Sequence, residues 1–307
     1  MTTPNQPIVP THKLVLCNIG EDGVGKTVCG LSISKQYPVT IPAPKPVTIT
    51  DTFWGCADLH ALTSARKCGL NVAEYFDIPT FLANKEAWKA EKVTAETDGA
   101  FVGKCRYTEA VRVMLNKMAA WLKVHPGGNL GLDTLSSISA GLFSEYAREA
   151  AYETGQHFSL RMPENMRNVY GQLLSAMELL SDYLMSMDFG ILILLLHTRA
   201  LVDMVDRDVK QQKAIRDTRK AGKALEDATI IPDASGNGIK FFKHHIIMQL
   251  PIKATRAPGA RTRARYFLTN PANSESMECK NKFEGVLSDR EPAHWLKVLA
   301  KINASKV

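Results

Sequence analysis

The 307-residue sequence lacks the features that mark membrane, secreted or zinc-binding proteins. Its longest apolar stretch, around FGILILLLHT, is far shorter than the roughly 20 residues that span a bilayer, and the N-terminal MTTPNQPIVPTH has no basic-then-apolar signal pattern. The six cysteines are scattered, without a C-x-x-C pair or matching histidine spacing, which favours reduced thiols. We therefore expect a folded cytoplasmic protein.

Acidic residues are absent between positions 234 and 274, in a chain of net charge +7. Basic and aromatic residues are mixed there, which is the pairing that single-strand nucleic-acid binders use. Because alternate residues of a strand point the same way, Arg261, Arg263 and Arg265 are expected on one face. A second basic stripe at helical spacing precedes them. The predicted DNA-binding residues are Lys210, Lys213, Arg216, Arg219, Lys220, Arg261, Arg263 and Arg265.

A glycine-rich segment, GEDGVGKT at 20–27, follows a short apolar run and matches the pattern G-x-x-x-x-G-K-[ST]. The apolar run predicts a strand over 13–19, and TVCGLSISKQY predicts a helix after the loop. Backbone N–H groups of such a loop converge on phosphate oxygens, while Lys26 neutralises the β- and γ-phosphates and Thr27 offers its hydroxyl to Mg²⁺. The predicted cofactor-binding residues are Gly20, Gly23, Val24, Gly25, Lys26, Thr27 and Val28.

Two further side chains stand at the ends of predicted strands. Asp133, after the apolar NLGL, is the candidate to hold the magnesium together with Thr27, and its alternative role is a helix N-cap. His197 ends the continuously apolar ILILLL strand, where ligands bind in open α/β sheets, and suits a sensor of the γ-phosphate. Its alternative role is a structural hydrogen-bond partner.

The order of elements predicts an α/β fold with a mainly parallel sheet flanked by helices, plus a C-terminal β-hairpin. Residues 1–12 read as a flexible tail and 13–307 as one domain. Strands are expected at 13–19, 47–51, 129–133 and 189–199, and residues 57–122 are expected to be mainly helical. In the last third, 203–238 reads as a charged loop region, 239–270 as a basic hairpin, and the tail as a turn with a closing helix.

Taken together, the order of motifs resembles the AAA-type, RecA-like ATPases of phages that act in single-strand annealing and recombination. The resemblance depends on GEDGVGKT, LDTLSS, VYGQLLSAMELL, ILILLLHTR and ECKNKFEGVLS, of which only the first is highly specific. It implies a RecA-like phosphate-loop core, ATP with Mg²⁺, single-stranded DNA as partner, a ring or filament of identical subunits, and the host cytoplasm as location. A single-strand binding protein is a further expected partner.

One position departs from that family's pattern. A catalytic glutamate is usual just beyond the second strand, whereas TDTFWG places Phe53 there. Asp51 or Asp58 is then the candidate to orient the attacking water, and without either the protein binds ATP as an assembly switch. Arg199 is a candidate to reach a neighbouring subunit's phosphate.

Other functions stay open on the sequence alone. A GTPase would need an N-K-x-D motif, and the nearest match, at 281–284, ends in Glu284. A metabolite kinase has no fixed acceptor signature, and a DNA-binding scaffold with a vestigial glycine loop is the non-catalytic alternative.

Overall fold

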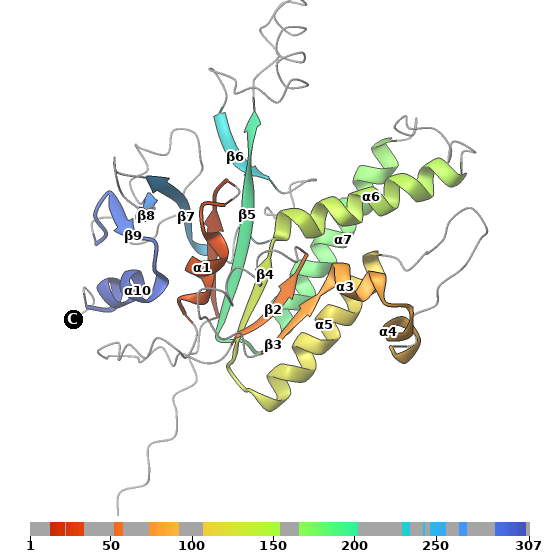
Figure 1. The fold of residues 1–307 in the computed structure, drawn as a ribbon, viewed down its shortest axis with the longest axis horizontal. Helices are drawn as coiled ribbons and strands as arrows, with labels where there is room; N and C mark the ends of the chain where they lie inside the picture. Colours follow the sequence, from red (N-terminus) through yellow and green to blue (C-terminus); the bar gives the residue numbers. More distant parts are fainter. Residues whose placement is uncertain are drawn as a thin grey trace, which may run out of the picture.

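The computed structural model describes residues 13–21, 23–33, 52–57, 74–91, 107–153, 166–201, 229–233, 242, 246–255, 264–268 and 286–304. Within them a nine-stranded sheet has the order β3-β2-β4-β5-β1-β7-β8-β9, with β6 paired to β5 (Figure 1). The strands are β1 (Leu14–Ile19), β2 (Thr52–Cys56), β3 (Glu74–Asp77), β4 (Asn129–Asp133), β5 (Ile191–Leu201), β6 (Thr229–Asp233), β7 (Ile246–Thr255), β8 (Ala264–Leu268) and β9 (Arg290–Pro292). The helices are α1 (Lys26–Leu31), α3 (Ile78–Ala83), α4 (Lys85–Ala90), α5 (Tyr107–Val124), α6 (Leu135–Glu153), α7 (Met166–Ser186) and α10 (Trp295–Ala304).

The sheet is parallel from β3 to β7 and antiparallel beyond. Strands β3, β2, β4, β5, β1 and β7 pair in parallel, whereas β8 pairs antiparallel with β7 and with β9. Carboxyl ends of all the parallel strands therefore lie at one edge of the sheet, which is where ligands bind in such folds. The predicted α/β fold, with a mainly parallel sheet flanked by helices and a C-terminal antiparallel hairpin, is confirmed.

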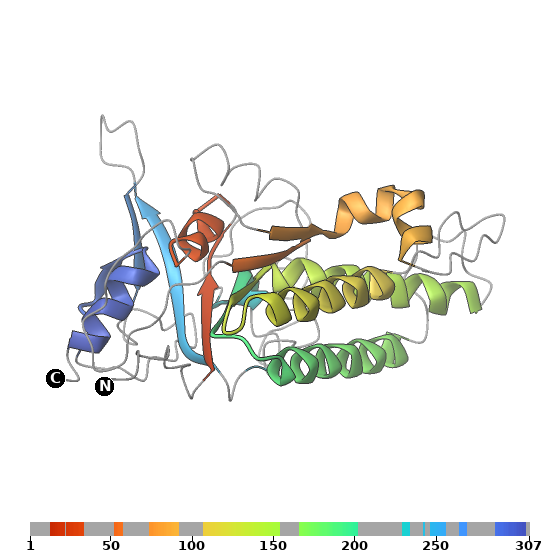
Figure 2. The same cartoon turned by 90° about the horizontal axis from the view of Figure 1, so that it is seen from below.

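Helices cover both faces of the central strands (Figure 2). In β5, Leu192, Leu194 and Leu196 pack in the core on the side of α5, α6 and α7. Ile191, Ile193 and Leu195 pack in a second core with residues of α1 and α10. This alternation explains why the strand is apolar at every position, as expected for a strand buried on both faces. None of the described helices is both long enough and apolar enough to cross a membrane.

Trp54 of β2 positions α1 on the sheet. Its side chain is fully buried, and a Cβ on Gly131 of β4 would lie 2.4 Å from its ring. A Cβ on Gly30 of α1 would lie 2.8 Å from the far edge of the same ring. Only glycine leaves room for the indole at these two positions, so α1 packs closely on the sheet directly behind the glycine loop.

Helix α10 is attached to the rest of the fold through Trp295. Its buried ring packs on Phe267 of β8 with 4.7 Å between centroids, and its backbone N–H donates to Ser32 Oγ at 2.9 Å. Glu291 of β9 is also buried and accepts hydrogen bonds from Lys301 Nζ of α10 at 2.6 and 2.7 Å. These contacts join β8, β9, α10 and the end of α1 into one packed unit.

Several short elements differ from the sequence predictions. The predicted strand at 47–51 lies outside the described residues. Strand β2 follows directly after it, at Thr52–Cys56. Strand β3 lies within the region predicted as helical, β6 within the predicted charged loop, and β9 within the predicted turn. Each of these strands pairs with a neighbouring strand on one side only, at an edge of the sheet. An edge strand needs few apolar residues, so its sequence gives only a weak strand pattern. The tail 1–12 lies outside the described residues, and the single domain stays a prediction.

Candidate functional site

The glycine loop joins β1 directly to α1 at the carboxyl edge of the sheet. Gly20 N donates to Leu196 O of β5 at 3.2 Å, which fixes the start of the loop to the neighbouring strand. Gly23 and Gly25 have φ of +71° and +97°, in the left-handed region that side chains disfavour. Cys29 N donates to Gly25 O at 3.0 Å and closes the first turn of α1. The strand, loop and helix predicted from the motif are therefore confirmed.

Lys26 lies inside this loop and is 6% exposed. Its ammonium donates to Gly20 O at 2.9 Å and Glu21 O at 2.8 Å, and it contacts His197 Nδ1 at 3.2 Å. Because an ammonium has no lone pair, Nδ1 accepts in this contact and the neutral imidazole has its proton on Nε2. The loop thus holds a buried cation beside backbone carbonyls and an imidazole.

Thr27 and Asp133 meet across the site, as the sequence predicts. Thr27 Oγ1 donates to Asp133 Oδ2 at 2.6 Å, and Asp133 is 1% exposed at the end of β4. The alternative role of Asp133 as the cap of α6 is wrong, because Ser137 N donates to Thr134 Oγ1 at 3.0 Å instead. The Asp133 carboxylate therefore reaches the loop through Thr27, while Thr134 supplies this cap of α6.

His197 is positioned by a residue that the sequence analysis missed. Its backbone N–H donates to Ser136 Oγ of α6 at 3.0 Å, and Ser136 is buried. The available signal was the hydroxyl cluster T-L-S-S directly after Asp133, at the end of a predicted strand. Residues from α1, β4, β5 and α6 thus form one site at the glycine loop.

Phe53 does not occupy a strand end. It lies within β2, is 4% exposed, and packs near Trp121 of α5 with 6.0 Å between ring centroids. The expectation that it replaces a catalytic group is wrong, since the first residue beyond β2 is Ala57, whose N–H donates to Asp133 O at 2.8 Å. Asp51 and Asp58 lie outside the described residues.

Most of the predicted DNA-binding residues are not described. Lys210, Lys213, Arg216, Arg219, Lys220, Arg261 and Arg263 lie outside the described residues. Arg199 lies in β5, and its side chain is likewise outside the described part.

Two of the residues predicted to bind the cofactor have side chains in the core. Val24 is buried in the core beside α1, and Val28 is half-buried against the same core.

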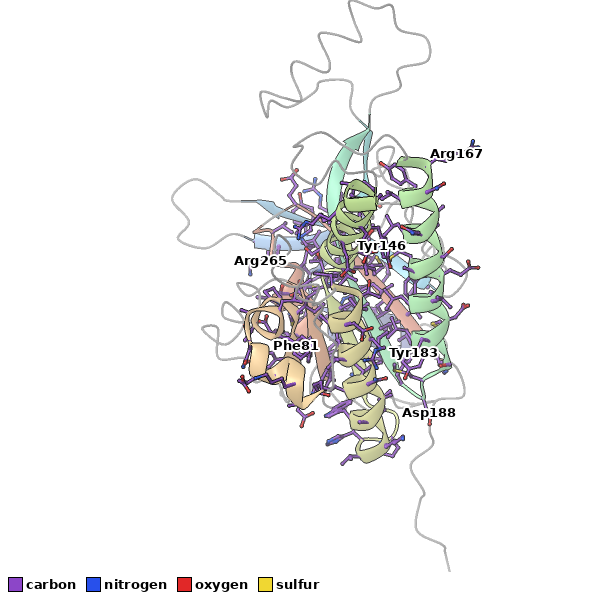
Figure 3. The ribbon with its side chains drawn as sticks, turned by 90° about the vertical axis from the view of Figure 1, so that its right-hand side faces the viewer. Phe81, Tyr146, Arg167, Tyr183, Asp188 and Arg265 are labelled. Atoms are coloured by element: carbon purple, nitrogen blue, oxygen red, sulfur yellow. The ribbon has the colours of Figure 1, made fainter. Side chains whose placement is uncertain are left out.

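Arg265 is described, and it lies at the glycine loop. A Cβ on Gly25 would come within 2.5 Å of Arg265 Nε and 3.0 Å of its Cζ. Figure 3 shows Arg265 among the C-terminal strands, on the opposite side of the view from Arg167 and Tyr183 of α7. The site therefore receives a side chain from β8 that the sequence analysis assigned to a separate DNA surface.

Comparison with known proteins gave no matching family model and no matching curated protein. Among solved structures, the chain is similar to a KaiC-like protein from Pyrococcus horikoshii, with TM-score 0.35, 13% identity, and 91% of this chain and 84% of that chain covered. It is also similar to the flagellar accessory protein FlaH from Methanocaldococcus jannaschii, with TM-score 0.33, 11% identity, and 91% and 86% covered.

Proposed function

We propose that this protein binds ATP with Mg²⁺ at the loop formed by residues 20–28 and hydrolyses it. The observation that supports this best is the meeting of Lys26, Thr27, Asp133 and His197 at the ends of three adjacent strands. A loop with two left-handed glycines presents consecutive backbone N–H groups to an anion, and the buried ammonium beside it supplies positive charge.

The donor set fits a hydrated magnesium ion. Thr27 Oγ1 and Asp133 Oδ2 are hard oxygen ligands, and Mg²⁺ in nucleotide sites is held by few protein ligands together with phosphate oxygens and water. When bound, the ion neutralises charge on the β- and γ-phosphates. Thr27 would hold it directly and Asp133 through water, while Lys26 would hold the γ-phosphate and His197 would orient the Lys26 ammonium.

Removing the Lys26 ammonium tests nucleotide binding directly. We expect Lys26→Ala to weaken ATP affinity at least about tenfold, since a charge-assisted hydrogen bond contributes about 1.5–3 kcal/mol. Titration calorimetry of the parent and the variant measures this, with Lys123→Ala as a control because Lys123 is exposed at the end of α5. Equal ATP affinity in the parent and Lys26→Ala would defeat the proposal.

We propose further that the protein uses ATP to bind and anneal or pair single-stranded DNA in recombination. The support is the net charge of +7 and the absence of acidic residues from 234 to 274, where arginines and lysines alternate with aromatic residues. The two hairpin strands within this segment are β7 and β8, and β7 continues beyond the end of β1 to the level of the loop. DNA contact there is thus compatible with coupling to ATP.

The Arg261→Ala/Arg263→Ala double variant tests the DNA proposal. Each lost contact to a single-stranded phosphate lowers the slope of log affinity against log salt by about 0.7, so the double variant should lose about 1.4. Fluorescence anisotropy with a labelled oligonucleotide at several salt concentrations measures it. The Lys89→Ala/Arg112→Ala variant is the control, since both residues pair with glutamates on α4 and α5. An unchanged slope would remove the hairpin from the DNA site.

ATP turnover with and without single-stranded DNA separates this enzyme from the alternatives. The proposed recombination ATPase shows turnover that rises with DNA and a particle that is larger than one subunit, as a ring or filament. Turnover that depends on a small-molecule acceptor would indicate a metabolite kinase instead. Tight ATP binding without turnover would indicate an assembly switch.

A further inference from the structure

Strand β8 brings Arg265 past the end of β1. Ile19, the last residue of β1, pairs with Pro251 of β7, and β7 continues from there to Thr255. In the antiparallel partner β8, Arg265 pairs with Ala254. Arg265 therefore lies in the part of the hairpin that extends beyond β1, at the level of the glycine loop.

The Arg265 side chain contacts the loop at Gly25. An added Cβ there would lie 2.5, 2.7 and 3.0 Å from Nε, Cδ and Cζ, so the guanidinium lies directly over this residue. Among the described residues, no carboxylate pairs with Arg265 and no hydrogen bond from its side chain is found, and the residue is exposed. Burial raises the pKa of the Cys29 thiol in α1, while hydrogen bonds with Trp295 and Asn18 and the charge of Arg265 lower it, so Arg265 is also near the start of α1.

We propose that Arg265 binds the α- and β-phosphates of the nucleotide held by this loop, which makes it part of the nucleotide site rather than of a DNA surface. The inference rests on the proposed function. In loops of this pattern the backbone N–H groups cradle the α- and β-phosphates while the lysine reaches the β- and γ-phosphates. Lys26 here is held on the side of Gly20, Glu21 and His197, so a guanidinium over Gly25 supplies a second cation at a different point of the loop.

This assignment gives the C-terminal hairpin a role in the site. A planar guanidinium donates to phosphate oxygens through two N–H groups at once, so it fixes the strand that holds it relative to the ligand. Binding of a nucleotide would then tie β8 to the loop between β1 and α1. Asp133 of β4, His197 of β5, the loop after β1 and Arg265 of β8 would then surround the phosphates together.

Affinities of Arg265→Gln and Arg265→Lys for ADP and ATP test the proposal. We expect Arg265→Gln to weaken both about equally and by about tenfold, the effect of one charge-assisted hydrogen bond. Arg265→Lys should recover part of the loss because it keeps the charge but not the fork. Arg290→Gln is the matched control, since Arg290 lies in the neighbouring strand with its cation 5.0 Å from the Tyr266 ring centroid. Affinity for an oligonucleotide without nucleotide should be unchanged in Arg265→Gln.

Three results would overturn the assignment. ADP and ATP affinity equal to the parent's would show that the guanidinium makes no contact with phosphate, and tighter binding would show that it obstructs the loop. A loss of oligonucleotide affinity alone would return Arg265 to the DNA surface. Thermal unfolding of both Arg265 variants verifies that they are folded.

The Lys26→Ala variant, measured alongside, separates this inference from the proposed function. If Lys26→Ala loses affinity and Arg265→Gln does not, only the role of Arg265 fails. If the parent binds neither nucleotide, or Lys26→Ala binds as well as the parent, the proposed function fails and this inference fails with it.

Discussion

The parallel and antiparallel parts of the sheet contribute to the site in different ways. The ends of the parallel strands β4 and β5 supply Asp133 and His197, and the loop that follows β1 leads to the buried Lys26 of α1. Each is held by hydrogen bonds to neighbouring elements. The antiparallel strand β8 supplies the exposed Arg265, which only contacts the loop. One side of the loop is therefore fixed before any ligand binds, and the other side is completed by a hairpin that pairing with β7 puts in place.

The two parts also differ in what attaches them to the fold. Strands β5 and β1 are buried between two separate cores, whereas the core residues of β8 and α10 belong to the second core alone, where Trp295 packs on Phe267. The Lys301–Glu291 ion pair also joins α10 to β9. If this contrast is correct, substitutions in the antiparallel part should mainly lower the unfolding free energy, and substitutions at the site in the parallel part should mainly lower the ATPase rate.

The largest effect is expected for Trp295→Ala, which removes the anchor of α10. Truncating a buried tryptophan costs about 3–5 kcal/mol of unfolding free energy, and here it also takes away the packing on Phe267. Urea unfolding followed by fluorescence and circular dichroism measures it. Trp121→Ala, in the core of the parallel part, is the comparison. A second transition in Trp295→Ala alone would show that the antiparallel part unfolds separately, and a loss below about 1 kcal/mol would contradict the anchoring role.

Asp133→Asn is expected to affect chemistry instead of stability. The carboxylate would hold the metal ion that neutralises the reacting phosphates, and loss of one such electrostatic contribution lowers turnover about 100-fold. The steady-state ATPase rate at saturating Mg²⁺ measures this. Asp77→Asn is the control, because Asp77 also ends a parallel strand but caps α3 through Thr80 N at 2.9 Å, and asparagine caps equally well. Similar rates in both variants would separate Asp133 from the metal.

Lys301→Met should destabilise the antiparallel part by about 1 kcal/mol, since Glu291 is buried but Lys301 is half-exposed. Burial raises the pKa of Glu291, but hydrogen bonds from Lys301 and Ser288 outweigh it and lower the pKa below its ordinary value. The stabilisation is therefore present above the ordinary pKa and is lost as the pH falls through the lowered one. Urea unfolding at several pH values should show that the difference in unfolding free energy between parent and Lys301→Met becomes smaller in acid, whereas substitution of the exposed Lys123 by Met gives no such change.

The smallest effect is expected for Glu145→Gln in the parallel part. The carboxylate of Glu145 in α6 accepts hydrogen bonds from Thr108 N at 2.9 Å and from Thr108 Oγ1. It thereby caps the first turn of α5. Burial raises its pKa, the Thr108 hydrogen bonds lower it, and Glu149 raises it, with a net increase. Its contribution is therefore full below the ordinary pKa and declines as the pH rises through the raised one. Glutamine keeps an acceptor without this titration, so the variant should lose that pH dependence. An identical pH profile in parent and variant would contradict the account of this cap.

The site residues that could be predicted are those marked by a motif or by an apolar run next to them in the sequence. The loop at 20–27, Asp133 and His197 each follow an apolar run, and parallel pairing brings the carboxyl ends of such runs together. Thr134 was the unrecognised cap of α6, because Asp and Thr are both good N-caps and only geometry decides between them.

The position of Arg265 could not be predicted, because it depends on how strands far apart in the sequence pair with one another. The predicted basic hairpin correctly includes a strand at Arg265, but nothing in the local sequence shows that β7 also pairs in parallel with β1. Because of that pairing, Arg265 lies next to the glycine loop, whereas the sequence analysis placed it on a separate hairpin. The edge strands β3, β6 and β9 were missed for a related reason, since strand pairing on one side leaves only a weak apolar pattern.

A crystal structure of the complex with ATP and Mg²⁺ tests the central claim most directly. We predict phosphates against the backbone N–H groups of residues 23–27, the metal on Thr27 Oγ1, and the Lys26 ammonium at the γ-phosphate. A nucleotide bound elsewhere, with the loop at 20–27 unchanged and in contact with solvent alone, would contradict it.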